Sequence, residues 1–313
     1  MNRRRITRAD SEWPSRLDEP GVSEPPRRLF AEGAPLATDG CAVAVVGSRR
    51  PTVAGLQMAG EIARGVAEAG LPVVSGLAIG IDAAAHAAAL DAGGYTVAVL
   101  GCGLDVDYPK RNARLRRRIS ESGTLLTEHE DGDPPQPANF PARNRIIAGL
   151  CEAVVFVEGT DRSGGLITAR CALDANRSVF AVPGSVRNPL AAGPNELIRT
   201  GNAALVTGVQ QILEDIAPGL VWGDPKGRLP HGQPSVNPVE AALLGVLDDA
   251  PTTLDQMCAA LGLSFGEVAM GLAALEVRNF VAKRFGGYSI TQGGARARQA
   301  LPLDEAEGRD ESF

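Results

Sequence analysis

The chain has 313 residues, a formal net charge of −6, 44% hydrophobic residues and 22% charged residues. This composition is typical of a soluble globular protein, and the length allows about two domains with a sizeable core. It excludes a membrane-spanning helix, since no run of about 18 apolar residues occurs, and the start lacks the apolar stretch of a secretory signal. The acidic balance argues against indiscriminate coating of nucleic acid, but it is compatible with a local basic cleft. We therefore expect a cytoplasmic protein.

Residues 1–40 are rich in proline, glycine and charged residues. This composition predicts a weakly structured lead-in. Within it, Leu29 and Phe30 are predicted to form a short edge strand.

From residue 41 to residue 216 the sequence alternates between short apolar runs and helical stretches. The apolar runs are typical of parallel strands buried on both faces, at 42–47, 72–76, 95–101, 123–128, 153–159 and 178–184. Helices are predicted at 52–69, 80–92, 109–121, 144–150, 164–175 and 194–200. This alternation indicates crossover units, and hence an α/β fold with a doubly wound parallel sheet.

The C-terminal third changes character twice. Residues 217–236 carry many prolines and glycines without periodicity and are interpreted as a linker. In residues 237–292, three short helices precede a hairpin that turns at Gly286–Gly287, which is the outline of a small winged-helix domain. Residues 293–313 are interpreted as an acidic tail without regular structure.

The third helix of this C-terminal domain, 264–278, does not look like a reader of duplex DNA. It carries Glu267 and Glu276, and its one arginine, Arg278, stands at the far end. A helix that enters the major groove normally begins with cations or amides. We therefore interpret the domain as an auxiliary or partner-binding module.

The segments that follow the predicted strands are candidates for a ligand site, because open parallel sheets bind ligands beyond the carboxyl ends of their strands. They contain glycine together with serine or asparagine, as in "GSRRPT" (47–52) and "EGTDRSGGLIT" (158–168). Such loops let a backbone approach a phosphate, and helix N-termini attract anions. Tight turns also need glycine for structural reasons, so a single loop of this kind is weak evidence. The prediction therefore rests on several such loops converging on one crevice. The phosphate seats predicted in this way are Gly47, Ser48 and Arg49, and Ser163, Gly164 and Gly165.

The densest basic cluster is "YPKRNARLRRRIS", with Pro109 predicted at the first helical position. Its cations fall within an arc of about 120° on the predicted helix. Few acidic partners offset them, and two lie in the first turn, where the helix dipole disfavours cations. Either this is a solvated helix face, or an anion lies nearby. The cations in the arc are Lys110, Arg111, Arg114, Arg117 and Arg118.

A second cluster, "FPARNRIIAG" at 140–149, places an aromatic residue before two arginines. Phe140 could stack on a base while Arg143 and Arg145 hold phosphates. The alternatives are a hydrophobic plug for Phe140 and an internal ion pair for one arginine, with a carboxylate such as Glu158.

Catalytic and cofactor signals are weak. Asp82 and His86 share one helix face and could form a metal or acid–base pair, but they are interpreted as partners in the core. Glu158 and Asp161 could attack a nucleotide's sugar, but only their position near a glycine turn suggests it. Neither the dinucleotide-binding G-x-G-x-x-G nor the Walker motif occurs, so we predict no catalytic residue and no cofactor. The five cysteines form no CxxC pair and are interpreted as reduced thiols, which leaves no predicted metal site.

Together these motifs resemble the DNA-processing protein A family, also called DprA or Smf. The resemblance covers roughly residues 25–290 and rests on the order and number of its motifs. They are "VAVVGSRRPT", "SGLAIGIDAAAH", "TVAVLGCGLDVDYPKRN", "FPARNRIIAGL", "VEGTDRSGGLITARCAL", "VFAVPG" and "GPNELIRTG".

The resemblance implies an extended Rossmann-like domain that binds single-stranded DNA, followed by a winged helix. It also implies a non-enzymatic homodimer that loads the recombinase RecA onto the strand during natural transformation. Two departures stand out: Ile79 occupies a position where many relatives have arginine, and the N-terminal helical module of many members looks absent or vestigial. The predicted contacts with DNA and phosphate are Gly47, Ser48, Arg49, Arg50, Ser75, Gly76, Lys110, Asn112, Phe140, Arg143, Asn144, Arg145, Ser163, Gly164 and Gly165.

Two other functions remain open from the sequence. A nucleotide-processing enzyme on a related sheet would need a closed pocket with a placed carboxylate, whereas a DNA-binding mediator needs an open basic groove. The third possibility, a transcription regulator, is disfavoured by the acidic helix of the winged-helix domain.

Overall fold

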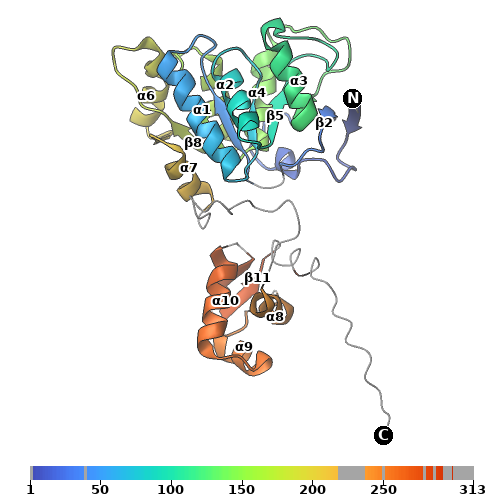
Figure 1. Ribbon diagram of the computed structural model, residues 1–313, viewed down its shortest axis with the longest axis vertical. Helices are drawn as coiled ribbons and strands as arrows, with labels where there is room; N and C mark the ends of the chain where they lie inside the picture. The colour runs from blue at the N-terminus through green and yellow to red at the C-terminus, as the bar shows by residue number, and fades with distance from the viewer. Residues whose placement is uncertain are drawn as a thin grey trace. The chain divides into compact units, whose positions relative to one another are not determined.

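The computed structural model of the chain describes residues 3–38, 41–217, 237–248, 251–277, 280–284, 287–291 and 298. The chain divides into two compact units, one within residues 1–228 and the other within 229–313. Figure 1 shows a sheet with helices in the first unit and a small helical domain in the second. The predicted linker and acidic tail lie outside the described residues, apart from Ala217 and Arg298.

The first unit is organised around one mixed sheet. In the described part of the chain this sheet has nine strands in the order β1-β2-β6-β5-β4-β3-β7-β8-β9. Neighbouring strands from β6 to β9 are parallel, whereas β2 is antiparallel to both β1 and β6. The strands are β1 Arg3–Ile6, β2 Leu29–Gly33, β3 Val43–Val46, β4 Val73–Ser75, β5 Thr96–Val99, β6 Thr124–Thr127, β7 Ala153–Phe156, β8 Ser178–Ala181 and β9 Ala204–Leu205.

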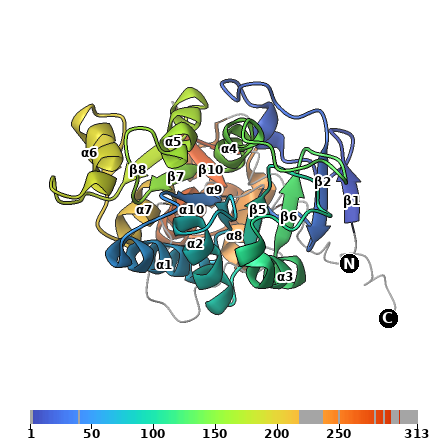
Figure 2. The same ribbon diagram turned by 90° about the horizontal axis from the view of Figure 1, so that it is seen from above.

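Helices cover both faces of the sheet, as Figure 2 shows, with α1, α2 and α3 on one side and α4 and α5 on the other. Alternation along β3 explains the two layers: Val43 and Val45 pack with the α1–α2 cluster, while Ala44 and Val46 pack with the α4–α5 cluster. The helices are α1 Val53–Glu68, α2 Ile81–Asp91, α3 Ala113–Ser122, α4 Asn139–Leu150, α5 Gly164–Asp174, α6 Ala192–Arg199 and α7 Val209–Ile216, with 3-10 turns at η1 Ser15–Asp18, η2 Lys110–Asn112 and η3 Pro189–Ala191.

The predicted doubly wound α/β fold is therefore confirmed, but two helix starts were wrong. The helix predicted from 109 begins at Ala113, because Pro109 is extended and a 3-10 turn follows it. The helix predicted from 144 begins at Asn139, so Phe140 and Arg143 lie inside its first turns. Pro141 is compatible with that early start, because a first-turn residue needs no amide hydrogen bond.

The expectation of a weakly structured lead-in is wrong for residues 3–38. Strand β1 forms the edge of the sheet, and β2 lies between β1 and β6 rather than at the edge. Leu17 is fully buried and Trp13 nearly so, both in the cluster beneath α4 and α5. Arg177 next to β8 pairs with Glu19 at 2.5 Å, which ties this segment to the far part of the domain.

The strand order fixes where a ligand site can form. The chain runs from β3 outward through β4, β5 and β6, and then returns to β7 on the other side of β3. The loops that leave β3 and β7 therefore diverge, which opens a crevice at their carboxyl ends.

The described residues of the second unit form three helices and a two-stranded antiparallel hairpin, and the predicted winged-helix domain is confirmed. Leu243, Met257 and Leu272 come from the three helices and form a common core. Arg278 and Gly286 lie outside the described residues. The elements are α8 Pro238–Val246, α9 Leu254–Leu261, α10 Phe265–Val277, β10 Val281–Arg284 and β11 Gly287–Ile290.

In the described part of the chain, no single helix is long and apolar enough to span a membrane. One pair of helices, Leu254–Leu261 and Phe265–Glu276, is long and apolar enough when the two are taken together, but they are bent by 113° at the break between them.

Candidate nucleic-acid interface

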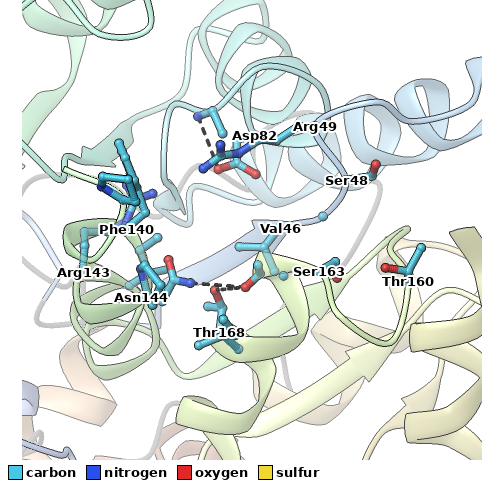
Figure 3. A pocket seen from close by; sticks show the side chains of 18 of the residues that line it. Val46, Ser48, Arg49, Asp82, Phe140, Arg143, Asn144, Thr160, Ser163 and Thr168 are labelled. Carbon is cyan, nitrogen blue, oxygen red and sulfur yellow. Dashed lines mark hydrogen bonds between the residues drawn. The ribbon is translucent and has the colours of Figure 1, made fainter. Parts of the chain in front are cut away.

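A pocket of about 550 Å³ occupies the crevice at the carboxyl ends of β3 and β7. Three elements surround it: the loop from β3 to α1, the start of α4, and the loop from β7 to α5. Figure 3 shows Ser48 and Arg49 on one side, Phe140, Arg143 and Asn144 on a second, and Thr160 and Ser163 on a third. The site thus lies where the sheet topology predicts a ligand.

The β3–α1 loop passes tightly between two other elements. The Ser48 amide donates to the Glu158 carbonyl at 2.6 Å, and the Ser48 carbonyl accepts from the Ile81 amide at 3.2 Å. A Cβ on Gly47 would lie 2.7 Å from the same Glu158 carbonyl, so only glycine fits there. The Ser48 hydroxyl accepts from the Arg50 amide at 3.0 Å, which shapes the turn that presents Arg49.

An exposed cation and two aromatic rings form a column at the mouth of the pocket. The Arg49 guanidinium lies 5.4 Å from the centroid of the Phe140 ring, within cation–π distance. The Phe140 and Tyr108 centroids are 5.3 Å apart, with the ring planes tilted by 34°. Tyr108 is 37% exposed, while one edge of Phe140 packs against Gly101. Phe140 is therefore both a packed side chain and part of the pocket wall.

The N-terminus of α5 forms the opposite wall. Its first amides have no intrahelical acceptor, and the helix dipole adds partial positive charge there. At Gly164 no atom lies within 4 Å of an added Cβ, whereas at Gly165 an added Cβ would lie 2.7 Å from the Phe156 ring. The Asn144 amide and the Thr168 hydroxyl both donate to the Gly164 carbonyl, at 3.2 and 3.4 Å. These bonds hold the helix start in place (Figure 3).

Beneath the mouth lies a buried cation, Arg143, which is 4% exposed. It donates to the backbone carbonyls of Gly76, at 2.9 Å, and of Val99. Burial lowers the pKa of its guanidinium to about 10, and Arg49 acts in the same direction while Asp82 opposes it. Arg143 therefore stays positive at neutral pH and lines the floor of the pocket.

Asp82 is the partner charge beneath the pocket. Its carboxylate accepts from the Gly76 amide at 3.1 Å and from the Ala78 amide at 3.4 Å, which folds the β4–α2 loop around it. Burial raises the pKa of this carboxyl, while Arg143 acts in the opposite direction. The predicted contact between Asp82 and His86 is not formed; the His86 Nδ1 lies 2.7 Å from the Thr96 hydroxyl instead.

Several residues predicted to touch phosphate lie inside the fold. The Ser75 hydroxyl is buried and donates to the Val45 carbonyl at 2.7 Å, and the Asn112 amide is buried and donates to the Leu77 carbonyl at 2.9 Å. Gly76 is also buried, because the Arg143 guanidinium lies where its Cβ would be. These three residues shape the loops through these contacts, and their direct contact with a ligand stays a prediction, with Gly76 and Asn112 lining smaller hollows beside the pocket.

Arg145 forms the internal ion pair that the sequence left open as an alternative for one arginine. It pairs with Glu128 at 2.7 Å and does not line the pocket. Its carboxylate partner is therefore Glu128 rather than Glu158. Arg50 and Lys110 are exposed but lie outside the lining of the pocket.

Several lining residues were missed by sequence reasoning, among them Tyr108, Thr160 and Thr168. Tyr108 stands in the quoted motif "DYPKRN", but its place beside Phe140 depends on a contact across 32 positions of the chain. Thr160 lies in a polar loop without any distinctive spacing. All three residues stand in the quoted motifs, but neither motif shows which of its side chains faces the pocket.

Two acidic residues near the site, Asp82 and Glu158, are tied to the backbone, whereas Asp161 on the β7–α5 loop is exposed. The Glu158 carboxylate accepts from the Thr52 amide at 2.8 Å and from the Thr52 hydroxyl at 2.7 Å, so it anchors the start of α1. Among the described residues that line the pocket, Asp82 is the single acidic one. No group of three histidine, cysteine or acidic side chains suited to a metal ion occurs in the described part of the chain.

Comparison with known proteins agrees with this architecture. Residues 4–217 match the model of the DNA recombination-mediator protein A family, and residues 228–287 match that of the DprA winged-helix domain. Protein Smf of Escherichia coli (strain K12) is 41% identical over 286 residues, which cover 90% of this chain and 75% of the relative. DNA processing protein DprA of Streptococcus pneumoniae is 49% identical over 173 residues, which cover 55% of this chain and 61% of the relative.

Two solved structures share the fold. DNA processing protein A from Streptococcus pneumoniae superposes with a TM-score of 0.65 at 43% identity, over 68% of this chain and 74% of that one. DNA processing protein A from Helicobacter pylori, which has been described with a unique single-stranded DNA binding mode, gives a TM-score of 0.62 at 29% identity, over 69% of this chain and 95% of that one. The chain therefore belongs to the DNA recombination-mediator protein A family, also known as DprA or Smf.

Proposed function

We propose that this protein binds single-stranded DNA at the pocket formed by the carboxyl ends of β3 and β7, without catalysing a reaction on it. The observation that carries the proposal is the column of Arg49, Phe140 and Tyr108 facing the N-terminus of α5 across that pocket. Cations and helix amides suit phosphates, and aromatic faces suit bases of any sequence. Membership in the family supports the same conclusion.

A single strand fits this arrangement better than a duplex. An aromatic side chain can stack on a base only when one face of that base is free. Inside a duplex both faces of a base are covered by its neighbours. The ring of Tyr108 is exposed at the pocket mouth, and Arg49 lies beside Phe140, so base and phosphate contacts stand next to one another. A duplex would present its phosphates to Arg49 but keep its bases away from the rings.

The second candidate, a nucleotide-processing enzyme, has less support. Such an enzyme needs a carboxylate free to act on the substrate. The Asp82 carboxylate instead accepts two backbone amides beneath the pocket, and Glu158 is bonded to Thr52. Incubation with nucleoside monophosphates followed by chromatography tests this candidate, and we expect the nucleotides to be recovered intact.

We further propose that the protein acts as a cytoplasmic homodimer that loads RecA onto the bound strand during natural transformation. The support is the description of the family as a DNA recombination mediator, together with the RecA loading that the resemblance to this family implies. RecA-dependent strand exchange on DNA coated with single-strand-binding protein tests the loading step. Stimulation by this protein is expected, and its absence would count against loading but not against DNA binding. Light scattering tests the dimer.

The binding proposal is tested by gel shift with single-stranded and duplex DNA of equal length. Because phosphate contacts release counterions, affinity for the single strand should fall steeply between about 0.05 and 0.2 M salt. We expect the single strand to bind more tightly at both concentrations. Equal or tighter binding of the duplex would overturn the proposal.

A further inference from the structure

A second hollow lies beside the pocket and shares a residue with it. This groove, of about 790 Å³, runs between the starts of α1 and α2 on one side and η2 with α3 on the other. Arg49 lines both the pocket and the groove, and therefore marks the point where they meet. Ile79 also lines the groove, and it lines a small cavity of about 70 Å³ that reaches behind Phe140 and Tyr108.

The two sides of the groove differ in chemistry. One side consists of small or apolar residues, Leu56, Ala83, Ala84 and Ala87, which allow an extended chain to lie close to α2. The other side carries three arginines on η2 and α3, Arg111, Arg114 and Arg118, beside Asn112 and Leu115.

The positive charge on this side of the groove is only partly balanced. Arg118 pairs with Asp91 at 2.6 Å, but Arg111 and Arg114 are exposed, and neither has an ion-pair partner among the described residues. Arg114 also stands four residues before Arg118 on the same helix, where like charges repel. An anion lying in the groove would offset this repulsion.

We infer that a DNA strand held in the pocket continues past Arg49 into this groove, where Arg111, Arg114 and Arg118 contact its phosphates and the alanine-lined side contacts its sugars and bases. Continuity of the two hollows at Arg49 and the excess of positive charge on one wall carry the inference. It rests on the proposed single-strand binding and extends it: the interface is longer than the pocket, and the groove determines how affinity grows with strand length.

Helix α3 offers a matched pair of variants. Arg114 and Arg117 are both exposed and without an ion pair in the described part of the chain, but only Arg114 lines the groove. Arg114→Ala and Arg117→Ala therefore remove the same charge from the same helix. Arg114→Lys retains the charge. Melting temperatures of all three variants check that the fold is intact.

The experiment measures the affinity of the full chain for oligo-dT of two lengths, about 4 and about 16 nucleotides, by fluorescence anisotropy across a salt series. We expect Arg114→Ala to weaken binding of the longer strand several-fold and to flatten its salt dependence by about 0.7 in log–log slope. Binding of the shorter strand should not change, Arg117→Ala should behave like the wild type with both strands, and Arg114→Lys should recover most of the loss.

Other outcomes overturn the inference in distinguishable ways. Equal effects of Arg114→Ala and Arg117→Ala would mean that α3 contributes only a general field. Equal weakening of both strand lengths by Arg114→Ala would place Arg114 at the pocket itself. If Arg49→Ala weakens binding while Arg114→Ala does not, the strand leaves the pocket elsewhere. If neither variant changes binding, the assignment of the strand to the pocket fails as well, although single-strand binding itself stands.

Discussion

Arg49 and Arg143 are both cations of the pocket, but the fold exposes only one of them. Arg143 is fixed by backbone carbonyls at the floor of the pocket, so we expect it to act mainly through its positive potential. Arg49 is free to meet a phosphate at the surface. The same residue type therefore has two roles, which burial separates.

Phe140 can be tested with two substitutions that differ in what they remove. Phe140→Ala removes both stacking and packing, whereas Phe140→Leu keeps an apolar side chain against Gly101. We expect both variants to lose about 1–3 kcal/mol of single-strand affinity, the value of one stacked base. Titration with oligo-dT measures the loss. Wild-type affinity of a folded Phe140→Leu protein would show that the residue only fills space.

Buried His86 makes the stability of the domain depend on pH. Burial lowers the pKa of His86 to about 3, and Arg143 acts in the same direction. The unfolded chain, with an ordinary value near 6.5, therefore takes up the proton first as the pH falls. The free energy of unfolding should decrease below about pH 6.5 by up to about 1.4 kcal/mol per pH unit.

The variant His86→Gln isolates this contribution. Asp82 has a raised pKa and therefore acts in the opposite direction, with stability lost as the pH rises above its unfolded value. Because Asp82 is present in both proteins, the difference between them reports on His86. Denaturant unfolding should give a flatter pH dependence for the variant. Parallel curves would show that His86 does not titrate in this way.

Sequence reasoning could identify the residue types of the site but not where their side chains point. The motif containing Arg143, Asn144 and Arg145 marked the right helix. One of its arginines lies under the pocket and the other pairs with Glu128, which is fixed by how α4 packs against the sheet. Asn112 and Ser75 were likewise correct in position but serve backbone carbonyls. Such choices depend on contacts between elements, which no local pattern records.

At the scale of elements, the N-terminus of α5 provides a matched test. Gly165→Ala should lower the free energy of unfolding by about 1–3 kcal/mol, because its Cβ would press on the Phe156 ring. Gly164→Ala meets open space, so it should leave stability unchanged or raise it by about 0.5–1 kcal/mol. It should nevertheless weaken DNA binding, because the new methyl group stands where a phosphate approaches the helix start.

Denaturant unfolding and strand titration on the same preparations separate the two effects. Unchanged DNA binding by Gly164→Ala would show that the strand does not approach this helix.

The strands between β3 and β8 were readily predicted, because strands buried on both faces leave an apolar run that is hard to miss. Strand β1, "RRRI", has no such signal, since its pairing with β2 supplies most of its structure.

At the scale of the whole molecule, every residue of the pocket and groove belongs to the first unit. We therefore expect a fragment of residues 1–217 to bind single-stranded DNA with nearly the affinity of the full chain. Anisotropy titration of both proteins checks this, with circular dichroism as a control for folding. A folded fragment that has lost binding would assign the strand to the winged-helix domain.

The N-terminal segment shows what limits prediction at this scale. Residues 3–38 lack periodicity, yet they complete the sheet and contact distant parts of the chain, as in the ion pair between Arg16 and Glu152. Proline and glycine indicate an irregular path and do not indicate whether that path is packed. The doubly wound parallel sheet, by contrast, follows from the alternation of strands and helices, and so does a ligand site beyond the carboxyl ends of its strands.

The central claim is that the pocket holds the backbone of a single strand through Arg49. The most direct test is the salt dependence of poly-dT binding by the wild type, Arg49→Ala and the control Arg64→Ala, which removes an exposed charge on α1 away from the pocket. Arg49→Ala should weaken binding and reduce the log–log slope by about 0.7, one phosphate's share, while Arg64→Ala leaves the slope unchanged. The weakening should be equal for a strand of mixed sequence. An unchanged slope for folded Arg49→Ala, or an equal reduction in both variants, would contradict the claim.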